Sequence, residues 1–393
     1  MSREAVAPTV RSALAARLGA GGWSALPPLG VLAVVWIVFQ IANPSFLSSA
    51  NLVNLAMQSA ATGLIALGVV FVLIVGQIDL SVGAVASLAG AIVGILFVGS
   101  DWPALAAIAV ALVVAAGIGA LYGLVVIRFR APGFVVTLAG LLAVLGAQSW
   151  LLRGSGSIGL PVDSWLVTFA QQGYLPDAVA YGVAAAGGLA WVAARIVTRA
   201  RRRHAGLPYG RLWTIVLAGA LLLAALLGAV WYLGLGRGVG AVFVVLLGAV
   251  VVADIVLRRT RWGRSLHAVG GGEEAARRVG IRTGGVMISA FIVCSVLAAV
   301  GGILGTARLA AAVQGGATDD VYLTAIAAAV IGGTSLFGGR GSAWSALLGI
   351  VIITSLGSGF TLLALDSSTR LLITGAVLLA AVIVDSLARA RRR

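Results

Sequence analysis

Residues 54–99 read NLAMQSAATGLIALGVVFVLIVGQIDLSVGAVASLAGAIVGILFVG, and this stretch decides the fold class. It contains two long apolar runs, 54–76 and 81–99, and a helix of about 20 apolar residues is long enough to cross the hydrocarbon core of a bilayer. Residues 77–80 alone separate the two runs. We therefore predict two consecutive transmembrane helices joined by a short break.

The composition extends this prediction to the whole chain. Of the 393 residues, 61% are hydrophobic and 10% are charged, and the mean hydropathy is +1.10. A soluble domain carries about a quarter charged residues, so lipid must be the solvent for most of this surface. The sequence leaves no room for a soluble domain and predicts an all-α, polytopic integral membrane protein.

Further apolar runs of similar length follow the same pattern. They lie at approximately 25–42, 103–126, 132–152, 177–197, 212–234, 238–257, 284–307, 321–337, 342–361 and 369–388. We therefore predict about 12 transmembrane helices in a single domain, residues 25–388. Segment 1–24 and the basic tail 389–393 are predicted to lie in the cytoplasm.

The arginines indicate how these helices are oriented. The chain has 27 Arg and no Lys, and its net charge is +15. With this set of spans, all but Arg153, Arg237, Arg308 and Arg370 fall on one side of the membrane. Cytoplasmic loops are enriched in basic residues, so both termini are predicted to be cytoplasmic. The charge is explained by orientation, and nucleic-acid binding, the other meaning of so basic a chain, is not expected.

Few ionisable residues lie inside the predicted spans. Asp254 and Asp385 each precede an arginine by four residues, the spacing at which two side chains meet on one helix face, and we interpret both as neutralised helix ends. Cys294 is the sole cysteine. No catalytic residue, metal site or cofactor is predicted, nor a proton relay of the kind that a proton-coupled transporter needs. A chain without Lys also cannot form a Walker-type phosphate loop, so another subunit must hydrolyse any ATP used.

Polar residues in the first of the two opening runs are candidates for a substrate pathway. Asn54, Gln58 and Thr62 recur every four residues and therefore share one helix face. Gln148 is a further isolated amide in an apolar run. The alternative for each is a hydrogen bond that holds neighbouring helices together.

The break between the two runs supplies two more candidates, Asp79 and Ser81. Capping of the first turn of the following helix is the simpler role for either side chain. A place on the substrate pathway is compatible with it, because broken helices line cavities in transporters.

Three motifs resemble the ABC-type monosaccharide permeases, the family of ribose, xylose, galactose and arabinose importers. They are LIALG at 64–68 with GQIDLSVG at 76–83; GRSLHAVGG at 263–271 with EAA at 274–276 and GI at 280–281; and AIAAAVIGGTSL at 325–336 with GGRGS at 338–342. The resemblance covers about residues 51–152 and 258–388. Family members usually carry Gly-Gly-Ile-Asp-Leu-Ser, and Gln77 replaces the second Gly here.

The resemblance implies that residues 258–283 form a cytoplasmic loop that couples the permease to an ATPase. The predicted coupling residues are Glu273, Glu274, Ala275, Ala276, Arg277 and Gly280. A short amphipathic helix at this place can fill a groove of a partner, whereas an ordinary solvated loop is the alternative. Residues 153–257 form an insertion with extra helices, which is similar to the xylose permease branch.

The expected function is that of the permease subunit of an ATP-driven importer for D-xylose or a related sugar, in the bacterial cytoplasmic (inner) membrane. The resemblance implies cytoplasmic ATP-binding subunits, an extracytoplasmic sugar-binding protein and a second permease copy in a homodimer, within membrane lipid. Import of a branched-chain amino acid or a nucleoside is the alternative within the superfamily. A proton-coupled secondary transporter is the alternative from another class.

Overall fold

The computed structural model describes residues 26–154, 156–315, 321–366, 368–376 and 379. The predicted cytoplasmic segment 1–24 and the tail 389–393 lie outside these residues. Most of the predicted span 369–388, with the expected pair of Asp385 and Arg389, lies outside them as well.

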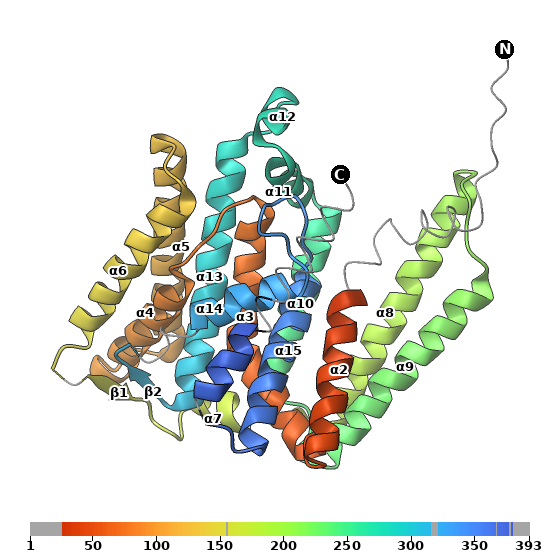
Figure 1. Ribbon diagram of the computed structural model, residues 1–393, viewed down its shortest axis with the longest axis horizontal. Helices are drawn as coiled ribbons and strands as arrows, with labels where there is room; N and C mark the ends of the chain where they lie inside the picture. The colour runs from red at the N-terminus through yellow and green to blue at the C-terminus, as the bar shows by residue number, and fades with distance from the viewer. Residues whose placement is uncertain (1–25, 155, 316–320, 367, 377–378, 380–393) are drawn as a thin grey trace.

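The described chain folds almost entirely into helices (Figure 1). The long helices are α2 (Leu26–Ala42), α3 (Ser49–Ile74), α5 (Ala104–Phe129), α6 (Gly133–Leu151), α8 (Asp177–His204), α9 (Leu212–Gly234), α10 (Ala241–Arg259), α13 (Thr283–Leu309) and α15 (Ala343–Leu362). The shorter ones are α4 (Val82–Gly94), which continues as the π-helix η1 (Ile95–Gly99), α7 (Trp165–Gln172), α11 (Arg261–Gly271), α12 (Glu273–Arg278) and α14 (Val321–Ile331).

The helices agree with the predicted spans in most places. Nine helices in the described residues are long and apolar enough to cross a membrane: α3, α4 with η1, α5, α6, α8, α9, α10, α13 and α15. Each coincides with a predicted span, and α2, a shorter apolar helix, coincides with the first one. The all-α, polytopic membrane fold is therefore confirmed, whereas the total of 12 spans stays a prediction.

The predicted span 321–337 differs from the structure. Only Val321–Ile331 is helical, and 11 residues rise about 16 Å at 1.5 Å per residue, roughly half of a bilayer core. The helix ends because Gly333 has φ +102°, a backbone conformation that favours glycine. The loop 332–342 then leads the chain to α15. The predicted span ran past this end to include Leu336 and Phe337, although the residues after Ile331 are mostly Gly, Ser and Thr.

Close packing of α13 against α3, α4 and α5 forms the centre of the bundle. Small residues at the contacts bring the helix backbones together. A Cβ atom at Gly68 would lie 2.8 Å from the carbonyl oxygen of Cys294, and one at Gly119 would lie 2.5 Å from that of Phe291. In lipid, where helix association depends on packing rather than on the hydrophobic effect, such contacts hold helices together. The high glycine content of the sequence is consistent with this packing.

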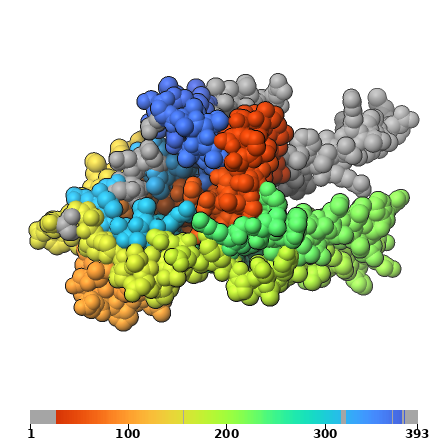
Figure 2. All heavy atoms as spheres, turned by 90° about the horizontal axis from the view of Figure 1, so that it is seen from below, coloured from red at the N-terminus to blue at the C-terminus, as the bar shows by residue number. Residues whose placement is uncertain are grey.

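The predicted insertion contributes a helical hairpin, α8 and α9, at the side of the bundle. The two helices pack mainly on each other, and Figure 2 shows them projecting from the body of the molecule. Two hydrogen bonds hold the base of α9 near the start of α3: Tyr232 Oη donates to the Leu47 carbonyl at 2.8 Å, and Ser49 Oγ donates to the Leu233 carbonyl at 3.1 Å.

A short antiparallel strand pair, not predicted from the sequence, lies at one end of the bundle. In it β1 (Ser157–Gly159) pairs with β2 (Ala311–Val313), with Ile158 opposite Ala312. Strands of three residues carry too little alternation to be recognised in an apolar sequence. The pair joins two segments that are far apart in the chain.

The two ends of the bundle differ in charge. Helices α11 and α12 lie at one end, here called the α12 end, and the strand pair lies at the opposite one, the β1–β2 end (Figure 1). Ten arginines predicted to be cytoplasmic lie at or near the α12 end: Arg201, Arg202, Arg203, Arg258, Arg259, Arg261, Arg264, Arg277, Arg278 and Arg282. Arg308, predicted to be external, closes α13 beside the strand pair. The helix directions therefore separate the charges as expected.

Candidate functional site

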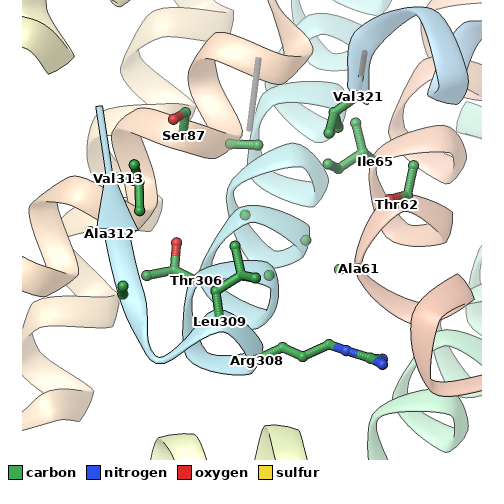
Figure 3. A pocket seen from close by; sticks show the side chains of 15 residues that line it. Ala61, Thr62, Ile65, Ser87, Thr306, Arg308, Leu309, Ala312, Val313 and Val321 are labelled. Atoms are coloured by element: carbon green, nitrogen blue, oxygen red, sulfur yellow. The ribbon is translucent and has the colours of Figure 1, made fainter. Parts of the chain in front are cut away.

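A cavity of about 200 Å³ lies between the three central helices α3, α4 and α13 (Figure 3). Strand β2 and the first residue of α14 complete its wall. Figure 3 shows Thr62 and Ile65 of α3 on one side, and Ser87 of α4 with Val313 of β2 on the other. Sites for drug-sized ligands measure roughly 300–1,000 Å³, so this cavity suits a smaller solute.

Small residues create the space. Gly301, Gly302 and Gly305 of α13 line the cavity together with Ala61 and Ala86. At Gly301 helices α13 and α3 touch through their backbones, because a Cβ atom there would lie 2.5 Å from the carbonyl oxygen of Ala61. One turn further on, a Cβ at Gly305 would lie 3.8 Å from that of Ala61. The helices therefore pack closely at one level and leave room at the next.

The polar groups of the cavity are three hydroxyls and one guanidinium. Thr62, Ser87 and Thr306 supply the hydroxyls, and Arg308 supplies the charge. Arg308 is half-buried, and its Nη1 atom is buried without a hydrogen-bond partner. No ion pair within the described residues includes it. Hydroxyl and guanidinium groups can bind the hydroxyls or an acidic group of a small polar solute.

Sequence reasoning placed Arg308 in an external loop and missed it as a site residue. It lies in the last turn of α13, and its carbonyl oxygen accepts a hydrogen bond of 2.9 Å from Gln171 Nε2 of α7. The signal that could have found it is an arginine inside the end of an apolar helix, where a charge is costly and therefore often marks a functional site.

The predicted pathway residues of α3 are brought near the cavity to different degrees. Thr62 lines it. Gln58 and Asn54 are one and two turns away on the same helix face, toward the β1–β2 end, because four residues make about one turn. Gln58 is exposed and Asn54 is half-buried. The three thus form one polar stripe that continues from the cavity.

Gln148 lies behind the cavity wall and does not line it. Its Nε2 atom donates to Ser87 Oγ at 2.6 Å and to the Val313 carbonyl at 3.1 Å. Its Oε1 atom accepts from the Gly315 amide at 3.4 Å. This buried amide therefore ties α6 to two cavity-lining elements, α4 and β2. The geometry agrees with the packing alternative raised for it.

Asp79 and Ser81 are buried in the break between α3 and α4, away from the cavity lining. Asp79 Oδ1 accepts hydrogen bonds from the Ser81 amide at 2.8 Å and from Ser81 Oγ at 2.7 Å. Neither side chain bonds an amide within the first turn of α4, where Ser81 is the N-cap without a side-chain cap bond. The expected capping is therefore replaced by a local bond that shapes the break itself.

The predicted coupling residues form α12 and the turn that follows it, at the α12 end. Glu273 Oε1 accepts from Arg277 at 2.7 Å and from Thr283 Oγ1 at 3.3 Å. Glu274 lies 3.6 Å from Arg278, and this pair is mostly exposed. Ala276 is buried, whereas the neighbouring Ala275 is exposed. The helix therefore presents a charged outer surface on a buried anchor.

Two further features of this end were predicted. Gly280 has φ +84°, which lets the chain turn sharply after α12, as expected from its place in the sequence. Arg258 Nε lies 2.8 Å from Asp254 Oδ1, so the predicted neutralised end of α10 is confirmed.

Comparison with known proteins shows the family to which the chain belongs. Residues 51–382 match the family model described as branched-chain amino acid transport system / permease component. The chain is 35% identical to the xylose transport system permease protein of Escherichia coli (strain K12), over 94% of this chain and 96% of that protein. It is 33% identical to the protein of the same name in Haemophilus influenzae, over 90% and 94% of the two chains.

Ribose permeases are similar too. The ribose import permease protein of Bacillus subtilis (strain 168) is 32% identical, over 91% of both chains. No solved structure matches the chain at a significant level.

Proposed function

This chain belongs to the family of transport-system permease components that its residues 51–382 match, and from this premise we propose that it imports D-xylose or a related monosaccharide. The chain is a multi-pass inner-membrane subunit of an ABC-type sugar transporter and not an enzyme. Relatives named for xylose and for ribose align along nearly its whole length. The identity to the xylose proteins is a few per cent higher, which supports a pentose and favours xylose.

The observation that carries the proposal is the cavity between α3, α4 and α13. It lies among helices that are long enough to cross a membrane, it is small, and the hydroxyl-bearing residues Thr62, Ser87 and Thr306 line it. A sugar presents hydroxyls that both donate and accept hydrogen bonds, which serine and threonine match. The Arg308 guanidinium adds donors at the β1–β2 end. A solute released at that end would meet Arg308 and the stripe of Asn54, Gln58 and Thr62.

Arg308 also supports a second candidate, a branched-chain amino acid. A guanidinium binds a carboxylate through two parallel hydrogen bonds, and the matching family model carries that name. A bound amino acid would also need a partner for its ammonium group. Among the described lining residues, no acidic side chain is present to supply one.

Transport energy comes from partners. The sequence has no lysine and hence no Walker-type loop, so ATP is hydrolysed by separate ATP-binding subunits. These subunits dock at the α12 end, on the charged surface of α12. A sugar-binding protein delivers its ligand at the β1–β2 end. The family to which the chain belongs supports both partners.

A second copy of the chain completes the pathway. Gln58 is exposed and lies about 14 Å along α3 from Ser49, at 1.5 Å per residue. An amide at this depth is costly to leave in lipid. A second permease that packs over this face would cover the amide or enclose it in a water-filled path, which supports the homodimer.

Reconstitution tests the proposal. The permease is placed in lipid vesicles with its ATP-binding subunit and binding protein, and uptake of labelled xylose, ribose and leucine is measured. We expect ATP-dependent uptake of xylose above that of the other two. Leucine uptake above that of both sugars would favour the amino-acid alternative. Sugar uptake by the permease alone, driven by a proton gradient without ATP, would overturn the proposed function.

A further inference from the structure

Three segments of the chain meet at glycines near the α12 end of the bundle. They are the break after α3, which begins with Gly76; the end of α11, at Gly270 and Gly271; and the loop 332–342 between α14 and α15, at Gly338 and Gly339. We call this meeting point the glycine junction. None of these residues lines the cavity or belongs to α12.

The contacts in the junction are made by backbone atoms. The Gly339 amide donates to the Ile74 carbonyl at 2.9 Å. A Cβ at Gly270 would overlap that carbonyl group and lie 2.6 Å from the Gly339 nitrogen. A Cβ at Gly338 would lie 2.8 Å from the Gly270 oxygen and 2.9 Å from the Gly76 Cα. Each segment therefore touches the other two with no side chain between them.

The junction connects elements with different roles. Helix α11 leads through Gly272 into α12, which carries the predicted coupling residues. The break joins α3 to α4, and both helices line the cavity. The loop 332–342 follows α14, which contributes Val321 to the cavity wall. The three segments that meet therefore connect α12, which carries the predicted coupling residues, to α3, α4 and α14, which line the cavity.

Helix α11 is also held firmly to the bundle. Trp262 stacks on Phe71 of α3, with ring centroids 5.6 Å apart, and its Nε1 atom donates to Ser289 Oγ of α13 at 2.7 Å. Leu266 and Val269 are buried. A displacement of α11 cannot be absorbed by side-chain rotation at the junction, because close-packed backbone contacts transmit it directly.

We propose that the glycine junction is the mechanical link through which movement of α11 and α12 reaches the α3–α4 break and α14, with Gly270 and Gly338 as its positioning residues. The inference rests on the proposed function, since it assumes an ATPase that moves α12. It goes beyond that function by assigning the route inside the chain.

Two adjacent glycines provide a matched test. Gly270→Ala places a methyl group against the Ile74 carbonyl, whereas Gly271→Ala places one in open space. Neither residue has a positive φ, so the two changes differ in contact alone. In the reconstituted transporter we expect Gly270→Ala to retain ATP-binding-subunit association and ATP hydrolysis. The amount of sugar imported per ATP should fall about 2- to 30-fold, as for changes along a coupling route.

The outcomes separate the two levels of inference. Gly271→Ala should keep the wild-type ratio of sugar to ATP. A wild-type ratio for Gly270→Ala, or an equal fall for both variants, would overturn the junction as the link. If the wild-type complex itself shows no ATP-driven uptake, the proposed function fails, and the inference that rests on it fails too.

If Gly270→Ala does not assemble with its partners, hydrogen exchange of the wild-type complex provides a second test. Exchange is measured with and without a non-hydrolysable ATP analogue. We expect nucleotide-dependent changes in residues 261–279 to be accompanied by changes in 74–82 and 335–341, including the Gly339 amide bonded to Ile74. Changes confined to 261–279 would contradict the link.

Discussion

Replacing Gln148 by leucine is expected to weaken the fold while leaving sugar preference unchanged. The side chains have similar volumes, so no cavity is created, but three hydrogen bonds are lost: those of 2.6 and 3.1 Å to Ser87 and Val313, and the one of 3.4 Å from the Gly315 amide. Hydrogen bonds between membrane helices contribute about 0.6 kcal/mol on average and up to about 1.7 kcal/mol. The free energy of unfolding should therefore fall by about 1–3 kcal/mol.

Gln58→Leu provides the matched control, because the chemical change is the same in a different environment. The side chain of Gln58 is exposed and makes no hydrogen bond to any described residue, so its replacement should change stability by no more than about 0.5 kcal/mol. Its place on the polar stripe next to Thr62 predicts a slower uptake of sugar instead. The two variants should thus separate a stability effect from a transport effect.

The single cysteine supplies the assay. Cys294 is fully buried in α13, and no other thiol exists in the chain. A dye that becomes fluorescent on reacting with thiols therefore reports unfolding of the bundle core in detergent without any engineered label. Thermal unfolding of both variants is compared with that of the wild type, and uptake of xylose and ribose is measured in vesicles.

Two results would refute this reasoning. If Gln148→Leu unfolds at the wild-type temperature, the amide bonds seen in the structure contribute nothing to stability. If Gln148→Leu instead changes the ratio of xylose to ribose uptake while remaining stable, Gln148 contacts the solute as a pathway residue.

Three further predictions concern the cavity, α12 and pH. Arg308→Gln should raise the half-saturating sugar concentration in uptake assays about tenfold or more, because a charged hydrogen bond contributes about 1.5–3 kcal/mol. Arg237→Gln, which removes another arginine predicted to be external, should leave this concentration unchanged. Equal effects of the two variants would argue against a contact between Arg308 and the sugar. Glu274→Arg should abolish pull-down of the ATP-binding subunit without altering Cys294 protection, since its 3.6 Å pair is exposed; undiminished pull-down would exclude this contact. Burial lowers the pKa of His267 in the folded protein. As pH falls below about 6.5, the unfolded chain therefore binds the proton first, and the stability of the folded state decreases. The variant His267→Gln should reduce this loss of stability in the thiol-reactivity assay, and an unchanged pH profile would contradict the prediction.

Local signals in the sequence were sufficient for most span positions and for two details of the α12 end. The turn at Gly280 and the pair of Asp254 with Arg258 depend on residues close together in the chain, so the spacing rules for helices and turns predicted them. Span 321–337 failed for a local reason as well. The predicted span was extended to Leu336 and Phe337, and the glycine turn at Gly333 was not recognised as the end of α14.

The roles of individual polar residues needed the structure. Gln148 and Gln58 look alike in the sequence, each an amide in an apolar run. Their surroundings are set by residues far away: Gln148 bonds Ser87 and Val313, which are 61 and 165 positions from it. No periodicity in one segment encodes which distant segment will face it.

The sequence by itself determined that this protein is a helical membrane protein, how its charges are distributed, and that it cannot hydrolyse ATP with a Walker-type loop. These properties follow from the apolar runs, the arginine positions and the absence of lysine, all of which act additively along the chain. The tertiary structure decided where the cavity lies, that Arg308 borders it, and that Gly270 touches the α3–α4 break. Those features arise where helices distant in sequence pack together, and close packing depends on the shapes of both partners at once.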